Sequence, residues 1–165
     1  MKKRIFVAVS GTSLSILAIV LLLQVWVSAQ AESGQRIVGS WDVTVTPRDC
    51  TTGDPIPFLP AFNAQQTYNL GGTMLANDPG IPGPPIIRVG GHGIWTQTKR
   101  GYSVAFRVFK FNPDGSSAGK DVVRDSVQMG PSGDTYTSTG TVDVYDPAGN
   151  IVLTGCATTS ATRFQ

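Results

Sequence analysis

The fold is decided by the stretch Gly39-Ser40-Trp41-Asp42-Val43-Thr44-Val45-Thr46, in which polar and apolar residues alternate. Strand side chains point to opposite faces with a period of two, so Trp41, Val43 and Val45 are predicted to share one face. We expect that face to point into the core. Trp41 is interpreted as a core residue and not as a ligand contact, because an indole buries a large apolar area. The stretch is therefore predicted to be a strand of a half-buried sheet.

The segment before this strand has the composition of an export signal. Met1-Lys2-Lys3-Arg4 is basic, residues 5–27 are mostly apolar, and Ala29-Gln30-Ala31 provides a small-x-small cleavage site. This order predicts a helical signal peptide over residues 1–31 and a single domain over residues 32–165. The apolar run is also long enough to span a membrane, so an uncleaved anchor is the alternative and the one membrane contact that the sequence suggests. We expect an exported protein, periplasmic or extracellular.

Charge and cysteine content narrow the partners further. The whole chain has a formal net charge of +2, but part of its basic charge lies in the first four residues. No cluster of Lys or Arg remains after residue 31, so a nucleic-acid partner is not expected. In an oxidising compartment Cys50 and Cys156 are predicted to form a disulfide. Two thiols and the single His92 do not make up a metal site, so neither a metal nor a cofactor is expected.

Turn-forming residues divide the chain after Thr46 into further strands and leave no predicted helix. The Pro-rich segments at residues 47–60 and 78–85 are predicted to be long loops, because proline cannot take part in a central strand. Gly71-Gly72 has the composition of a tight hairpin. The strands after the first are predicted over residues 65–70, 73–76, 92–98, 102–111, 120–129, 135–145 and 151–164.

Eight strands in hairpin order predict an all-β, antiparallel, up-and-down sheet. Closure into a barrel would remove the two edges that such a sheet exposes. In this arrangement every other connection lies at the same end of the barrel. The two long loops are the first and third connections, so they are predicted to surround one open mouth while the other end is tight.

Gly39-Ser40-Trp41, together with Arg163, resembles the lipocalins and the wider calycin superfamily. In those eight-stranded barrels a G-x-W on the first strand lies under a basic residue from the last strand. The resemblance implies that Arg163 stacks on Trp41 at the closed end, a cation–π contact of about 0.5–2 kcal/mol. Pairing Trp41 with Arg163 and Cys50 with Cys156 requires strand alignments that differ by only one pleat repeat, so the two pairings are compatible.

If Trp41 and Arg163 point inward, the alternation of the strands determines the other inward residues, and the barrel interior is predicted to be an apolar cavity. Small residues of the last two strands would leave space inside: Ser138, Gly140, Gly155, Ala157, Thr159 and Ala161. The predicted lining residues are Val43, Val45, Trp95, Tyr102, Phe106, Val123, Val127, Tyr136, Val142 and Leu153. The alternative is an interior filled by the aromatic side chains of Trp95, Phe106, Phe109 and Phe111.

Candidate catalytic groups are few. His92 is interpreted as an ordinary polar residue, because no second His and no carboxylate cluster lies at ligand spacing. Asp121, Asp125 and Asp143 are interpreted as solvated strand carboxylates. We therefore expect a barrel that binds a small apolar ligand without catalysis.

Two alternatives remain for the function. One is an isomerase or cyclase of the allene-oxide-cyclase kind, which would need inward polar groups, with Tyr136, His92 and Arg107 as the candidates. The other is an envelope-associated structural protein with a filled core.

Overall fold

The computed structural model describes residues 36–80 and 85–164, and the predicted signal peptide lies outside these ranges. Within them the chain forms strands and no helix. The strands are β1 (Gly39–Arg48), β2 (Phe62–Tyr68), β3 (Thr73–Asn77), β4 (Ile87–Arg88), β5 (Gly91–Thr98), β6 (Gly101–Phe111), β7 (Ser117–Met129), β8 (Thr135–Tyr145) and β9 (Ile151–Arg163). No helix long and apolar enough to cross a membrane is found in the described residues.

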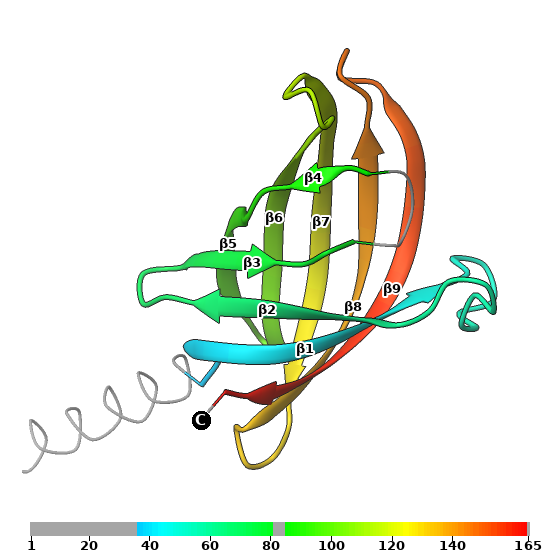
Figure 1. The fold of residues 1–165 in the computed structure, drawn as a ribbon. Helices are drawn as coiled ribbons and strands as arrows, with labels where there is room; N and C mark the ends of the chain where they lie inside the picture. The colour runs from blue at the N-terminus through cyan, green and yellow to red at the C-terminus, as the bar shows by residue number, and fades with distance from the viewer. Residues whose placement is uncertain (1–35, 81–84, 165) are drawn as a thin grey trace, which may run out of the picture. The chain divides into compact units, whose positions relative to one another are not determined.

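All strands except β4 form a closed antiparallel barrel (Figure 1). Neighbours along the chain pair with each other, β3 pairs with β5, and β1 pairs with β9 to close the ring. The predicted all-β, eight-stranded, up-and-down barrel is thus confirmed. The fold is consistent with a lipocalin-like barrel.

The short strand β4 is the difference from the predicted strand order. Arg88 of β4 lies opposite Lys110 of β6, and His92 of β5 lies opposite Arg107 of the same strand. The chain advances four residues from Arg88 to His92 but only three from Arg107 to Lys110. Segments β4 and β5 are therefore one strand interrupted by a bulge of one extra residue. The bulge reverses the alternation of side chains, so Arg88 points to the barrel interior although the inward residues of β5 have odd numbers.

The tight turns are those that the sequence predicts. Gly71 and Gly72, between β2 and β3, have φ of 89° and 88°, which only glycine adopts readily. The long connections, residues 49–61 and 78–86, both leave the ends of strands that point away from this turn. The asymmetry between a tight end and an end with long loops is therefore present.

Strand length differs around the barrel. In Figure 1, β6, β7 and β8 rise above β1, β2 and β3, which cross the lower part of the view. Strands β6 to β9 have 11 or 13 residues, whereas β2 and β3 have 7 and 5. One wall is consequently taller than the other at the end that carries the long loops, and we call this end the mouth.

The opposite end is closed by Arg163. Trp41 and Arg163 are paired residues of β1 and β9, as predicted. The guanidinium carbon lies 4.3 Å from the centre of the indole ring. Its N–H groups donate to the carbonyl oxygens of Val38 at 2.9 Å, Arg36 at 2.8 Å and Gly133 at 2.9 Å. One side chain thus connects the first strand, the last strand and the β7–β8 turn.

The core begins at this closed end and extends along β3 and β6 to Ala76 and Val108, toward the mouth. Tyr136 packs edge-on against Trp41, with ring centres 4.9 Å apart, and Trp95 packs edge-on against Tyr102 at 5.6 Å. The buried apolar residues form one cluster: Ile37, Trp41, Val43, Ala64, Tyr68, Met74, Ala76, Trp95, Tyr102, Val104, Phe106, Val108, Val127, Tyr136 and Ala161.

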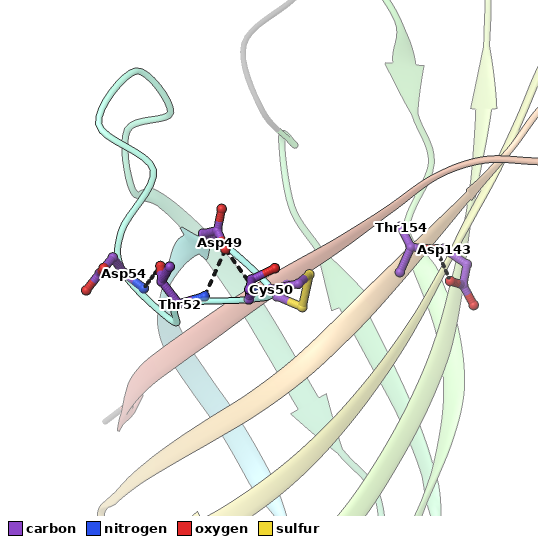
Figure 2. The surroundings of a disulfide bond; sticks show 8 residues. Asp49, Cys50, Thr52, Asp54, Asp143 and Thr154 are labelled. Atoms are coloured by element: carbon purple, nitrogen blue, oxygen red, sulfur yellow. Dashed lines mark hydrogen bonds between the residues drawn. A yellow bond between two sulfur atoms is a disulfide. The ribbon is translucent and has the colours of Figure 1, made fainter.

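A disulfide ties the mouth loop after β1 to β9 (Figure 2). Cys50 and Cys156 are bonded, with Cα atoms 5.2 Å apart, which confirms the predicted pairing. The next residues form a compact turn, because the carboxylate of Asp49 accepts hydrogen bonds from the backbone N–H of Thr51 and Thr52 at 2.7 and 2.9 Å. The beginning of the long 49–61 loop is therefore held against the barrel wall.

Replacing Trp41 by Phe should lower the free energy of unfolding by about 1–4 kcal/mol, because packing and the cation–π contact are both lost. Replacing Arg163 by Ala should also destabilise the protein. Because the two side chains touch, the double variant should lose less than the two single losses added together. Urea denaturation of the four proteins measures this, with circular dichroism as the control for unchanged strand content. Additive losses would contradict the stacking.

In the native protein neither cysteine should react with an alkylating reagent, whereas both should react after denaturation and reduction. The bridge spans 106 residues, so replacing both cysteines by Ser should cost up to about 4.7 kcal/mol in the chain-entropy model. Mass spectrometry of the alkylated protein and urea denaturation of the variant test the two statements. Labelling of both thiols in the native protein would contradict the bridge.

Candidate functional site

The barrel interior has two parts that differ in packing. Near the closed end, inward residues such as Val43, Tyr136 and Ala161 are buried. Farther along the same strands, inward residues keep accessible surface. We call the space that they border the bowl, and its residues are Val45, Val123, Asp125, Gly140, Val142, Gly155, Ala157 and Thr159.

The larger open hollow of the described residues has a volume of about 1210 Å³. Asp78 and Arg88 border it at the mouth, and Val43, Tyr136 and Ala161 border it inside. Most of its border is made of outward residues of β1, β2, β7, β8 and β9, such as Asp42, Asn63 and Thr137, and no residue of the bowl borders it. A second open hollow, of about 440 Å³, includes the bowl residues Asp125, Gly140 and Ala157, and Arg48, Asp49 and Arg124 border it as well.

The predicted lining residues fall into both parts of the interior. Val45, Val123 and Val142 keep accessible surface and border the bowl, while Leu153 is 60% exposed near the tip of the β8–β9 hairpin. The others are buried in the core beneath the bowl: Val43, Trp95, Tyr102, Phe106, Val127 and Tyr136. The alternative interior would be filled by four aromatic side chains. One of them, Phe109, is 48% exposed and does not fill the interior.

A polar cluster lies within the floor. The hydroxyls of Tyr68 and Tyr136 both donate to the amide oxygen Oε1 of Gln66, at 2.6 and 2.7 Å. All three residues are buried. Burial raises the pKa of both tyrosine hydroxyls, so they stay protonated and keep donating to Gln66. The floor of the bowl is thus closed by a satisfied hydrogen-bond network.

Asp125 is the unusual group of the bowl. It lies on β7 opposite Gly140 of β8, and its carboxylate occupies the space that a side chain at Gly140 would need. Among the described residues, none donates a hydrogen bond to it. Burial raises the pKa of the Asp125 carboxyl to about 6, because the ionised form loses contact with water. The site therefore contains a carboxylate that carries its charge at neutral pH without a cationic partner.

A second inward carboxylate, Asp121, forms ion pairs with two cations. Arg88 Nη1 lies 2.5 Å from its Oδ2, and Lys110 Nζ lies 2.6 Å from its Oδ1. Arg88 also reaches Asp78, at 2.9 Å, which ties the start of the 78–86 loop to the barrel wall. These four side chains are mostly buried, so the ion pairs are screened little by water. They form a neutral cluster at the side of the mouth.

The interpretation of Asp121 and Asp125 as solvated strand carboxylates is wrong. Both lie on the face of β7 that carries Val123 and Val127, which point inward. The signal was present in the alternation of β7, because residues two apart share a face. Asp143 does lie on the outside, where it pairs with Arg124 at 2.7 Å.

His92 and Arg107, two candidates for catalytic groups, point outward. Both are exposed, and Arg107 lies over the ring of Phe109, 5.9 Å from its centre. Of the three polar groups in the predicted enzyme alternative, the structure brings only Tyr136 into the interior. In the described part of the chain, no group of three or more His, Cys, Asp or Glu side chains could hold a metal ion.

Comparison with family models, with curated proteins and with solved structures finds no match to this chain. The site has to be interpreted from its own geometry.

Replacing Asp125 by Asn should stabilise the protein at pH 8. An unfolded Asp has a pKa near 3.8 and the folded one a pKa of about 6, so the ionised carboxylate lowers the stability of the folded state above pH 6. Below pH 3.8 both states are protonated and this cost disappears. One pKa unit corresponds to about 1.4 kcal/mol, so the gain at pH 8 should be up to about 3 kcal/mol.

The measurement is urea denaturation of both proteins at pH 8 and at pH 4. Asp143→Asn is the matched control, because the Thr154 hydroxyl and Arg124 lower the pKa of this outer carboxylate. Its replacement should not stabilise the protein at pH 8. An Asp125→Asn variant that is less stable than the natural protein at pH 8 would show that Asp125 has a cationic partner.

Proposed function

We propose that the protein is an exported barrel that binds a small, largely apolar molecule in the bowl. The observation that carries this proposal is the contrast in packing along the barrel. Along β8 and β9, inward residues near the closed end are buried, whereas those nearer the mouth, such as Val142 and Ala157, keep accessible surface. A protein with a filled core would bury both sets, because protein interiors are close-packed.

The surroundings of the bowl support a binding role. Its walls are mostly aliphatic or small, and ligand sites are typically apolar with a few placed polar groups. The mouth also carries exposed apolar side chains, with Phe58 81% and Leu153 60% exposed. Apolar side chains at a rim can cover the outer part of a ligand. The loops around them contain several prolines, which limits the ordering cost on binding.

Export is part of the proposal. Disulfides persist in oxidising compartments, and the Cys50–Cys156 bridge therefore supports a periplasmic or extracellular location. The basic, apolar and small-residue order of residues 1–31 supports the same conclusion. The stacking of Arg163 on Trp41 supports a relationship to the calycin superfamily. No nucleic-acid partner is proposed, and no membrane contact other than through an uncleaved N-terminal segment.

A proton-transfer enzyme is the second candidate, and one observation favours it. The Asp125 carboxyl, with a pKa of about 6, could act as a general base near neutral pH. The nearby tyrosines Tyr68 and Tyr136 are poor acids in this setting, because burial raises their pKa and both protons are donated to Gln66. A single carboxylate without a matched acid fits a binding site better than an isomerase or cyclase.

Linear alcohols of increasing chain length should bind to the natural protein, with a gain of about 0.8 kcal/mol for each buried methylene until the bowl is full. Ala157→Leu, which fills the bowl, should weaken binding of the longer alcohols by about tenfold or more. Ser103→Leu is the matched control, because Ser103 is exposed on the outer face of β6. Isothermal titration calorimetry measures all three proteins. No saturable binding of any alcohol would contradict the proposed function.

A further inference from the structure

We propose that the ligand of the bowl carries a protonated amine on an apolar body, and that the Asp125 carboxylate binds the amine. This inference rests on the proposed function, because it assigns the polar end of the ligand in the same bowl. It is carried by the position of Asp125, the space around its carboxylate and the charges of its neighbours.

The position of Asp125 places one charge deep in an otherwise apolar site. Its neighbours on β7 that share its face are Val123 and Val127, and its paired residues on β6 and β8 are Val104 and Gly140. Because Gly140 has no side chain, the carboxylate can lie across β8 toward the interior. Asp125 keeps accessible surface and borders the open hollow of about 440 Å³ together with Gly140 and Ala157, so a ligand group can reach it there.

The charged groups around Asp125 make their contacts with other residues. Arg48, Asp49 and Arg124 border the same hollow as Asp125, but Arg48 donates to the Thr158 hydroxyl at 2.9 Å and Arg124 pairs with Asp143 at 2.7 Å. On β7, Asp121 is four residues farther toward the mouth and already pairs with Arg88 and Lys110. From β2 and β8, Tyr68 and Tyr136 direct their hydroxyls to Gln66 and not to Asp125. On β6 the inward residue two positions from Val104 is Tyr102, which is buried in the core.

At the closed end the charge of Arg163 is matched by Asp134, 3.4 Å away. The remaining inward charges of the described residues are unbalanced by one. Arg88 and Lys110 are matched by Asp78 and Asp121, and Asp125 remains as the additional negative charge. An ionised carboxylate away from water is unfavourable unless it is paired and hydrogen-bonded. A ligand ammonium group supplies both the opposite charge and N–H donors, whereas a ligand carboxylate would be repelled.

The apolar part of the ligand would then extend from Asp125 toward the mouth. Val142 of β8 and Val45 of β1 offer aliphatic surface on this path, and Gly155 and Ala157 of β9 leave room for it. The chemical class that fits is an alkylamine or arylalkylamine. A neutral ligand of the same shape would bind more weakly, because it would leave the carboxylate without a counter-charge.

Octylamine, octanol and octanoate test the inference, because they share one chain and differ in the polar end. Calorimetry at pH 8 should give the natural protein an affinity for octylamine about tenfold or more above that for octanol, with octanoate weakest. In Asp125→Asn the preference for octylamine over octanol should fall to less than about threefold. Asp143→Asn, which removes the same charge from the outer face, should keep the natural preference.

The pH dependence gives a second readout. Octylamine stays protonated between pH 5 and pH 8, while Asp125, with a pKa of about 6, takes up a proton as the pH falls. The preference for octylamine should therefore shrink at pH 5, and octanol binding should not decrease. Asp125→Asn should show no such change, because it has no carboxyl to titrate.

The outcomes separate this inference from the proposed function. Equal affinity for octylamine and octanol in the natural protein would overturn the amine ligand and leave the apolar bowl standing. A preference for octylamine that persists in Asp125→Asn would also overturn the inference, since another group would then bind the amine. Failure of all three probes to bind would overturn both the inference and the proposed function.

Discussion

The barrel depends on the contact between Arg163 and Trp41, which joins the last strand to the first. The guanidinium stacks on the indole and also donates to backbone carbonyls on two sides, in the segment before β1 and in the β7–β8 turn. Arginine suits this position because its planar, five-donor group can stack and form several hydrogen bonds at once. Closure at this point removes the two free edges that the sheet would otherwise expose.

The same closure determines which side chains lie inside. Strand side chains alternate with a period of two, so a shift of one residue between strands would turn every inward residue outward. The alignment that buries Trp41 and Val43 also fixes the orientation of β9, β8 and β7 in turn, and brings Asp125 into the bowl. The cost of burying this carboxylate is offset by the packed core beneath it. The strand register that stabilises the barrel therefore also determines which residues form the binding site.

Much of the fold could be predicted from the sequence, because alternation and turn residues are local signals. The strands, the pairing of Trp41 with Arg163 and the disulfide are confirmed. The orientation of Asp125 could also have been predicted, since it is two residues from both Val123 and Val127. Residue type alone suggests that a carboxylate on a strand points to solvent. The alternation of β7 instead places Asp125 on the inward face.

The position of Arg88 could not be predicted in this way. It depends on the bulge between β4 and β5, which reverses the alternation, and a bulge is set by the partner strand as much as by local sequence. This bulge has a consequence for the site. Because Arg88 points inward, together with Lys110 it neutralises Asp121 and Asp78, and Asp125 is left as the inward carboxylate without a cation among the described residues. One inserted residue in β4–β5 therefore decides which carboxylate remains for a ligand.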